Sequence, residues 1–202
     1  MIITLTTAPA VEPVSATEVK KHLRLVTTTA EAAAYTTEDD LLDRLITVSR
    51  TQAEQETGRR FITQTLTMYL NGWPSERYIR IPYPPLQSAV VTYRLSDDDD
   101  YDETLTTADV DIVSEPGRII LQPNESWPSG ALYTDKPIKI VFICGYGVAV
   151  AVPENIKSAI LLKLSDLYEH RGEIVIGVSV GRITDAVDSL LRQYAVHAEF
   201  DF

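Results

Sequence analysis

The spacing of apolar residues changes twice along the chain, from helical to alternating and back to helical. Near the start, Ser15 and Glu18 have the spacing of a capping box, which predicts a helix running to about Leu25. After a loop rich in threonine and alanine, apolar residues at positions 41, 42, 45 and 46 follow one helix face, and Gly58 is a natural end. The first stretch therefore predicts two helices.

From Phe61 onward, apolar and polar residues alternate in short runs, as in half-buried strands. Turn signals rich in glycine and proline separate the runs. The expected strands lie near residues 62–68, 78–81, 89–93, 110–113, 118–121 and 138–142. Successive short strands of this kind predict a small antiparallel sheet or a barrel-like β unit.

Helical spacing returns after Gly145-Tyr146-Gly147. Pro153 and Glu154 open a helix that ends near Arg171, and Thr184 is expected to cap a last helix beyond a linker that contains glycines. The predicted fold class is α+β, a helical bundle of two N-terminal and two C-terminal helices interrupted by an inserted small antiparallel β unit. The expected parts are an N-terminal arm and helices (1–59), the β unit (60–150) and C-terminal helices completing the bundle (151–202).

Composition and charge narrow the functional classes. Hydrophobic residues make up 45% of the 202 residues, enough for a packed core. The single cysteine, Cys144, lies in an apolar run, so we expect a small buried side chain and no disulfide framework. The net charge of −11 disfavours a broad basic face that grips nucleic acid, although such a chain could surround DNA without binding it.

Neither a signal peptide nor a membrane span is expected. No lysine or arginine precedes position 20, and the longest apolar stretch, residues 141–152, is too short to cross a bilayer. The sequence predicts a soluble protein that folds in a reducing cytoplasm.

One segment matches a catalytic motif. Gly177-Val178-Ser179-Val180-Gly181 has the G-x-S-x-G pattern of a nucleophile elbow, in which the acid and histidine follow the serine across further strands and helices. Only residues 180–202 remain here, and His197 is the sole histidine among them. We therefore favour a linker between helices and expect no enzyme, and a serine hydrolase using Ser179 stays the alternative from another class.

The residues give no reason to expect a metal or another cofactor. His22, His170 and His197 lie on different predicted helices and share no ligand spacing. Gly177 and Gly181 are too close together for a phosphate loop, and no lysine follows them.

An acidic run falls between two predicted strands. It comprises Asp97, Asp98, Asp99, Asp100, Asp102 and Glu103. The run lacks the internal glycine and the spacing of an EF-hand, so a solvated loop tip is favoured over a calcium site. In a ring of subunits, the same loop from each copy could line a channel through which DNA passes.

An ordered set of segments covers most of residues 14–171. These are residues 16–24, 39–42, 56–59, 72–74, 81–88, 145–147, 152–160 and 167–171. Through these segments and their order, the chain resembles the head–tail connector (adaptor) proteins of tailed bacteriophages. The C-terminal part departs from the family pattern, since Thr184-Asp185-Ala186 opens the last helix and an acidic tail runs to Phe202.

The resemblance implies a structural virion protein. Such a protein forms a homo-oligomeric ring, a dodecamer in the virion, beneath the phage portal protein at the head–tail junction. It attaches after genome packaging, extends the DNA channel without specific DNA binding, and docks a head-closure or tail protein. Before assembly it is expected in the host cytoplasm, without a membrane. A head-closure or tail-completion protein is the alternative within this class, and a binding module from a prophage remnant is a further one.

Five residues are candidate contacts with a neighbouring subunit or the portal. Leu162 lies on a helical row of mostly polar residues, away from the main apolar stripe, where burial against the β unit is the other interpretation. The remaining candidates are Glu169, Arg171, Leu190 and Tyr194. Glycines in the linker 172–183 predict that it rearranges on assembly.

Overall fold

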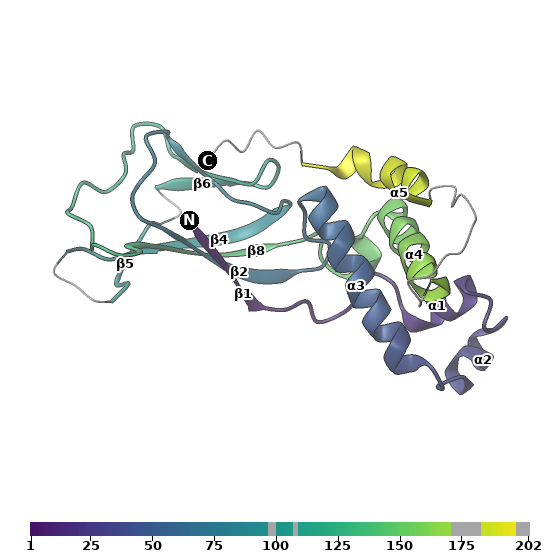
Figure 1. Cartoon of the computed structure of the whole chain (residues 1–202). Helices are drawn as coiled ribbons and strands as arrows, with labels where there is room; N and C mark the ends of the chain where they lie inside the picture. Colours follow the sequence, from purple (N-terminus) through teal and green to yellow (C-terminus); the bar gives the residue numbers. More distant parts are fainter. Residues whose placement is uncertain (97–99, 107–108, 171–182, 197–202) are drawn as a thin grey trace. The chain divides into compact units, whose positions relative to one another are not determined.

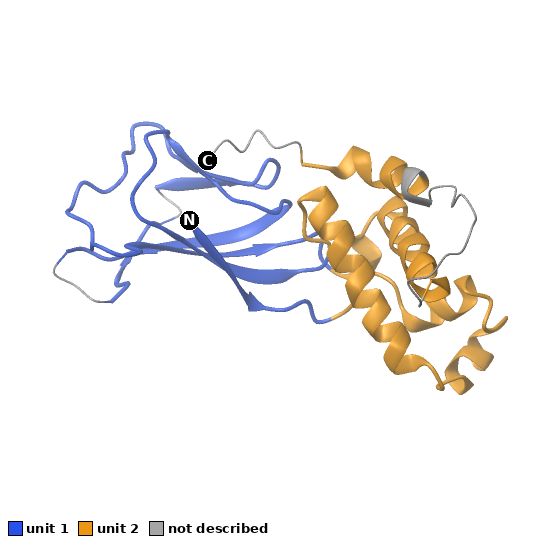
Figure 2. Ribbon diagram, viewed as in Figure 1, with its two compact units in different colours: residues 1–10, 62–147 blue, residues 11–61, 148–202 orange. Residues whose placement is uncertain are grey.

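The computed structural model describes residues 1–96, 100–106, 109–170 and 183–196, which form two compact units (Figure 2). The first, the β unit, comprises residues 1–10 and 62–147. The second, the helical unit, comprises residues 11–61 and 148–202. The chain passes between the units three times, so each unit is built from segments that are far apart in the sequence.

The β unit consists of two antiparallel sheets (Figure 1). The larger sheet contains, in spatial order, β1 (Ile2–Thr7), β2 (Gln64–Leu70), β8 (Ile138–Cys144), β4 (Leu86–Tyr93) and β5 (Glu103–Thr104). The smaller one contains β3 (Tyr78–Arg80), β7 (Arg118–Leu121) and β6 (Val110–Val113). Each strand is short and pairs antiparallel with its neighbour, as the alternating sequence predicts.

The core of the β unit lies between the two sheets because every second residue of the paired strands is apolar. Along β8, buried and half-buried residues alternate over the whole strand. The β2–β8 register sets Leu66 opposite Phe142 and Met68 opposite Ile140, and these side chains join Ile119 of the smaller sheet in one buried cluster. Cys144 belongs to the same cluster, which confirms its predicted burial.

A glycine is required where β8 ends. Gly145 has φ of +115°, and a Cβ on it would lie 2.4 Å from the carbonyl oxygen of Ile62. This close approach lets the Thr63 amide donate to the Gly147 carbonyl at 3.0 Å. Any side chain at position 145 would therefore push the two segments apart.

The helical unit packs helices from both ends of the chain together. Its helices are α1 (Ala16–His22), α2 (Thr29–Ala34), α3 (Asp39–Thr57), α4 (Glu154–Glu169) and α5 (Ile183–Leu191), with 3₁₀ turns η1 (Ala149–Ala151) and η2 (Arg192–Tyr194). Helix α3 contacts α1, α4 and α5, and α4 also contacts α5. Buried residues of α3 and α4 include Leu42, Ile46, Ile160 and Leu164. No helix within the described residues is long and apolar enough to span a membrane.

Helix ends follow the local sequence signals closely. The Ser15–Glu18 capping box of α1 is present, and Gly58 ends α3 in the left-handed conformation, both as predicted. Helix α2 was not predicted, although Thr28 and Glu31 form a second capping box at its start. Thr184 does not precede α5 as a cap but lies inside the helix, which begins at Ile183.

The prediction of a mixed fold with helices and antiparallel strands is confirmed, but one finer expectation needs correction. The first residues were expected to extend as an arm, whereas Ile2–Thr7 pairs with β2 over most of its length. The β unit is therefore more than an insertion between helices, because its first edge strand precedes them in the sequence.

Candidate assembly surfaces

A buried lysine organises the end of the helical unit where α3 begins. The ammonium of Lys20, only 4% exposed, lies 2.6 Å from a carboxylate oxygen of Asp39. It also donates to the backbone carbonyls of Ala32 and Tyr35, at 2.9 and 2.5 Å. Because burying an ammonium without partners is costly, these three acceptors fix α1, α2 and the start of α3 to one another.

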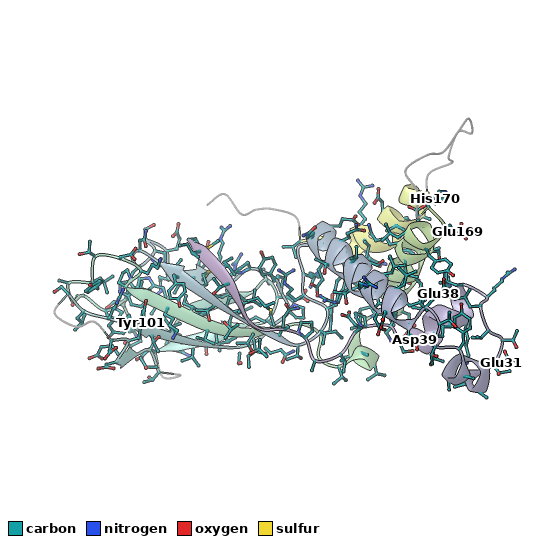
Figure 3. The ribbon with its side chains drawn as sticks, turned by 60° about the horizontal axis from the view of Figure 1, so that its bottom comes forward. Glu31, Glu38, Asp39, Tyr101, Glu169 and His170 are labelled. Carbon is teal, nitrogen blue, oxygen red and sulfur yellow. The ribbon has the colours of Figure 1, made fainter. Side chains whose placement is uncertain are left out.

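The residue before α3 links that helix start to α4. The carboxylate of Glu38 accepts hydrogen bonds from the hydroxyl groups of Tyr35 and Tyr168, at 3.0 and 2.7 Å. In Figure 3, Glu38 and Asp39 lie at the end of the helical unit that also carries Glu31. The tyrosine of α4 is thereby held beside the loop that enters α3.

A second buried network lies near the other end of α3. Arg50 bonds Glu12 at 2.7 Å and Glu54 at 3.1 Å, and Arg60 lies 3.4 Å from the same carboxylate of Glu54. Glu54 also accepts the backbone N–H of Phe61 at 3.0 Å. Burial is the largest influence on Glu54 and raises its pKa, while the Phe61 N–H and the two guanidinium groups act in the opposite direction.

The last described residues are held on the C-terminal end of α3. The N–H of Val196 donates to the carbonyl of Thr57 at 2.8 Å, which satisfies one of the acceptors left open at a helix end. The side chain of Arg59 donates to the carbonyl of Tyr194, and Lys163 of α4 pairs with Glu56 at 2.5 Å. The C-terminal segment is thus joined to α3 through backbone as well as side-chain contacts.

A pocket of about 370 Å³ opens at this same end of the helical unit. It is lined by Glu56, Asp188, Leu191, Arg192 and Ala195. Leu191 is buried at 3% exposure, whereas Asp188 and Arg192 are exposed at the rim. The pocket therefore combines an apolar floor with charged groups at its mouth, a pattern suited to an anchoring side chain.

In the β unit, an aromatic and cationic cluster holds the base of the acidic run. The guanidinium of Arg94 lies 4.0 Å from the ring centre of Tyr133 and 4.9 Å from that of Tyr101. Lys139 is 5.4 Å from the Tyr101 ring, and the hydroxyl of Tyr101 donates to the Lys136 carbonyl at 2.7 Å. Burial, the largest influence, raises the pKa of Tyr101. Tyr101 (labelled in Figure 3) thus fixes the chain directly after Asp100.

The predicted site residues are spread over both units. Asp100, Asp102 and Glu103 are exposed around Tyr101, while Asp97, Asp98 and Asp99 lie outside the described residues. Leu162, Leu190 and Tyr194 are half-buried, and Glu169 is exposed near the end of α4. Arg171 lies outside the described residues, as does the linker at 172–182. The structure contains one chain, so the proposed contacts of these residues with another subunit or the portal stay predictions.

Sequence reasoning missed the pocket. Four of its residues, at positions 188, 191, 192 and 195, follow helical spacing and so share one face, which is a signal that could have been found. Leu190 and Tyr194 were chosen instead, next to the pocket residues in sequence. The fifth lining residue, Glu56, comes from α3 and has no sequence signal linking it to the others.

The catalytic alternative gains no support from the described residues. Ser179 and His197 both lie outside them, so the nucleophile-elbow interpretation stays a prediction. Within residues 1–96, 100–106, 109–170 and 183–196, no group of three or more His, Cys, Asp or Glu side chains could hold a metal ion.

Solved structures from phage-like particles share this fold. A chain in the neck of an empty gene transfer agent particle, computed with C6 symmetry, has a TM-score of 0.78 and 20% sequence identity. The match covers 96% of this chain and 95% of that one. A chain from the virion of the native gene transfer agent particle has a TM-score of 0.76 at 20% identity. One from the native neck, computed with C12 symmetry, has a TM-score of 0.69 at 18% identity. No family model and no curated protein matches this sequence.

Proposed function

We propose that this chain is a structural subunit of the neck of a tailed phage or phage-like particle, where it acts as a head–tail connector. The observation that carries the proposal is the fold shared with neck chains over nearly the full length of both partners. The likeness includes the helical unit and the β unit together, which a chance match of a small common motif would not.

The proposed working form is a homo-oligomeric ring beneath the portal protein. The sixfold and twelvefold symmetry of the neck reconstructions supports a cyclic arrangement of identical subunits. Buried ion networks at both ends of α3 support rigid subunits, because they fix helix positions by directional contacts. In this proposal the ring extends the DNA channel and docks a head-closure or tail protein on its other side.

The acidic run in the β unit supports a channel that does not retain DNA. Asp100, Asp102 and Glu103 are exposed on both sides of the fixed Tyr101. A ring would repeat these carboxylates once per subunit, so phosphate groups moving past them would be repelled. We include this segment as the proposed channel lining.

The experiment that tests the function combines light scattering with electron microscopy of the purified chain, alone and mixed with the cognate portal. We expect either a ring-sized species or a monomer that joins the portal as a ring. A chain that stays monomeric and ignores the portal would contradict the connector proposal. An assay of generic ester substrates with Ser179→Ala as control separates the hydrolase alternative, since a connector has no such activity to lose.

A further inference from the structure

Arg24 occupies a backbone position that normally favours glycine. Helix α1 ends in a Schellman motif, in which the Leu25 N–H donates to the Lys20 carbonyl and the Arg24 N–H to the Lys21 carbonyl, at 3.0 and 3.1 Å. Arg24 is the residue after the C-cap and has φ of +56°. In this left-handed conformation a residue with a Cβ is less stable than glycine, so the local fold alone gives no reason for arginine at this position.

The side chain of Arg24 projects without a local partner. It is exposed, and no hydrogen bond or ion pair joins it to another residue in the described part of the chain. Leu23 and Leu25 on either side are half-buried, so the tip of this turn is a cation flanked by apolar groups. A strained residue that does not serve its own fold is a candidate for a contact with another molecule.

The pocket at the opposite end of α3 offers an apolar floor and, at its rim, the carboxylate of Asp188 beside the guanidinium of Arg192. Its floor is formed by Leu191 and Ala195, which can take the aliphatic part of a long side chain. At its rim the carboxylate of Asp188 is exposed, and no ion pair engages it within the described residues. Glu56, also at the rim, is already bound by Lys163, which leaves Asp188 as the carboxylate available to an incoming guanidinium.

Arg24 cannot reach this pocket in its own subunit. The ion pair between Lys20 and Asp39 places the end of α1 beside the first residue of α3, while Glu56 is the next-to-last residue of that helix. The 19 residues of α3 span about 28 Å at 1.5 Å per residue. An arginine side chain covers only a fraction of that distance, so the two features can meet only between copies.

We propose that the Arg24 turn of one subunit inserts into the pocket of the next, with its guanidinium on Asp188 and its aliphatic part on Leu191 and Ala195. The contact is head-to-tail, since turn and pocket lie at opposite ends of one helical unit, and such a contact closes into a ring when the rotation between neighbouring subunits divides the circle. This inference rests on the proposed function and names the contact by which the ring forms. We name a second copy of this chain as the occupant, because the Arg24 turn combines an exposed cation and a left-handed backbone with no hydrogen bond or ion pair of that side chain within the described residues.

The first test is a charge swap between the two partners, followed by sedimentation velocity across a concentration series. Arg24→Asp and Asp188→Arg should each weaken self-association by roughly 10-fold to 100-fold, and the double variant should recover most of the loss. Arg44→Asp and Asp43→Arg, two exposed positions on α3, serve as matched controls and should leave association unchanged. Recovery in the double variant is a result that unrelated damage at either position would not give.

The second test separates assembly from folding. Arg24→Gly relieves the backbone strain, so we expect its unfolding midpoint to equal or exceed that of the wild type while its self-association falls with that of Arg24→Asp. Association of Arg24→Gly at wild-type strength would overturn the inference. So would a wild-type ring whose formation the two charge reversals leave untouched, and in that case the ring proposal itself would stand. A wild-type chain that never self-associates, alone or on the portal, would refute both.

Discussion

The two units bury different kinds of side chain. In the helical unit the buried polar side chains include three charged ones, Lys20, Arg50 and Glu54, whereas among the described residues of the β unit they are Gln64 and Thr67. The buried cluster of the β unit is apolar throughout. The β unit is therefore stabilised by close packing of the apolar side chains that alternate along its strands. The helical unit is stabilised by packing combined with directional ionic contacts.

This difference predicts how each unit responds to change. An apolar core tolerates substitutions that conserve volume and loses stability when volume is removed. A buried ion network loses most when one partner is removed, because the remaining charges are left in a medium that solvates them poorly. The networks also set helix positions, which suits a unit whose ends we propose to meet neighbouring subunits.

The largest effect should come from the centre of the β unit. Phe142 is fully buried on β8, so Phe142→Ala should lower the free energy of unfolding by about 3–5 kcal/mol. Hydrogen exchange should show faster opening of β2, β4 and β8. Val90→Ala, at an exposed position on β4, is the control and should change little. If hydrogen exchange in α3 and α4 became faster by the same factor, the two units would open together, and the proposed difference between them would be wrong.

The next largest effect should come from the ion network near Glu12. Glu54→Ala deprives Arg50, Arg60 and the Phe61 N–H of a shared acceptor, and we expect a loss of about 3 kcal/mol in chemical denaturation. A loss below that of a pair with an exposed carboxylate such as Lys157 with Glu154, measured through Glu154→Ala, would show that the network adds no stability.

A smaller effect is expected at the start of α1. Ser15→Ala removes the side-chain acceptor of the Glu18 N–H, and should cost roughly 1 kcal/mol. Thr28→Ala tests the equivalent capping box of α2. If neither variant moves the unfolding midpoint, the two short N-terminal helices depend on the Lys20 contacts and not on their own caps.

The smallest effect is a pH dependence that compares wild type with Glu54→Gln. A carboxyl whose pKa is raised by folding adds to the unfolding free energy below its usual value of 4.5, and this contribution is lost as the pH rises through the raised pKa. Glutamine has no such proton, so wild type should lose stability relative to Glu54→Gln as the pH rises from below 4.5 through the raised pKa of Glu54. A relative gain over that range would mean that the guanidinium groups of Arg50 and Arg60 outweigh burial.

Local signals predicted the elements that depend on nearby residues. The Ser15–Glu18 capping box, Gly58 and the alternation along β8 each specify their structure within a few positions. β1 was missed because its six residues become a strand only by pairing with β2, about sixty positions later. Lys20 could not be recognised as buried, since its acceptors come from α2, the following loop and α3.

The candidate site was predictable only in part, for the same reason. The acidic run and the importance of the last helix are visible in the sequence, whereas the fixing of Tyr101 by Arg94 and Lys139 depends on three separate strands or loops. The pocket forms only when Glu56 of α3 lies near Asp188 of α5, and this proximity depends on how the two helices pack in the folded chain. The left-handed backbone of Arg24 had no signal either, because the usual glycine is absent.

The three passages of the chain between the units have a consequence for biosynthesis. β1 leaves the ribosome first but needs β2, which in turn needs β8, and the helical unit is finished only when α4, α5 and Val196 reach α3. A partial chain therefore lacks a completed β unit until residue 147 has been made, and the helical unit is completed only later, by segments from both sides of the β unit. A chain that ends before β8 exposes an unfinished sheet and an open helical core together, and one that ends between β8 and α4 still leaves the helical core open. Such a product is open to chaperones and proteases, so the pool of subunits available for assembly consists of chains that carry α5.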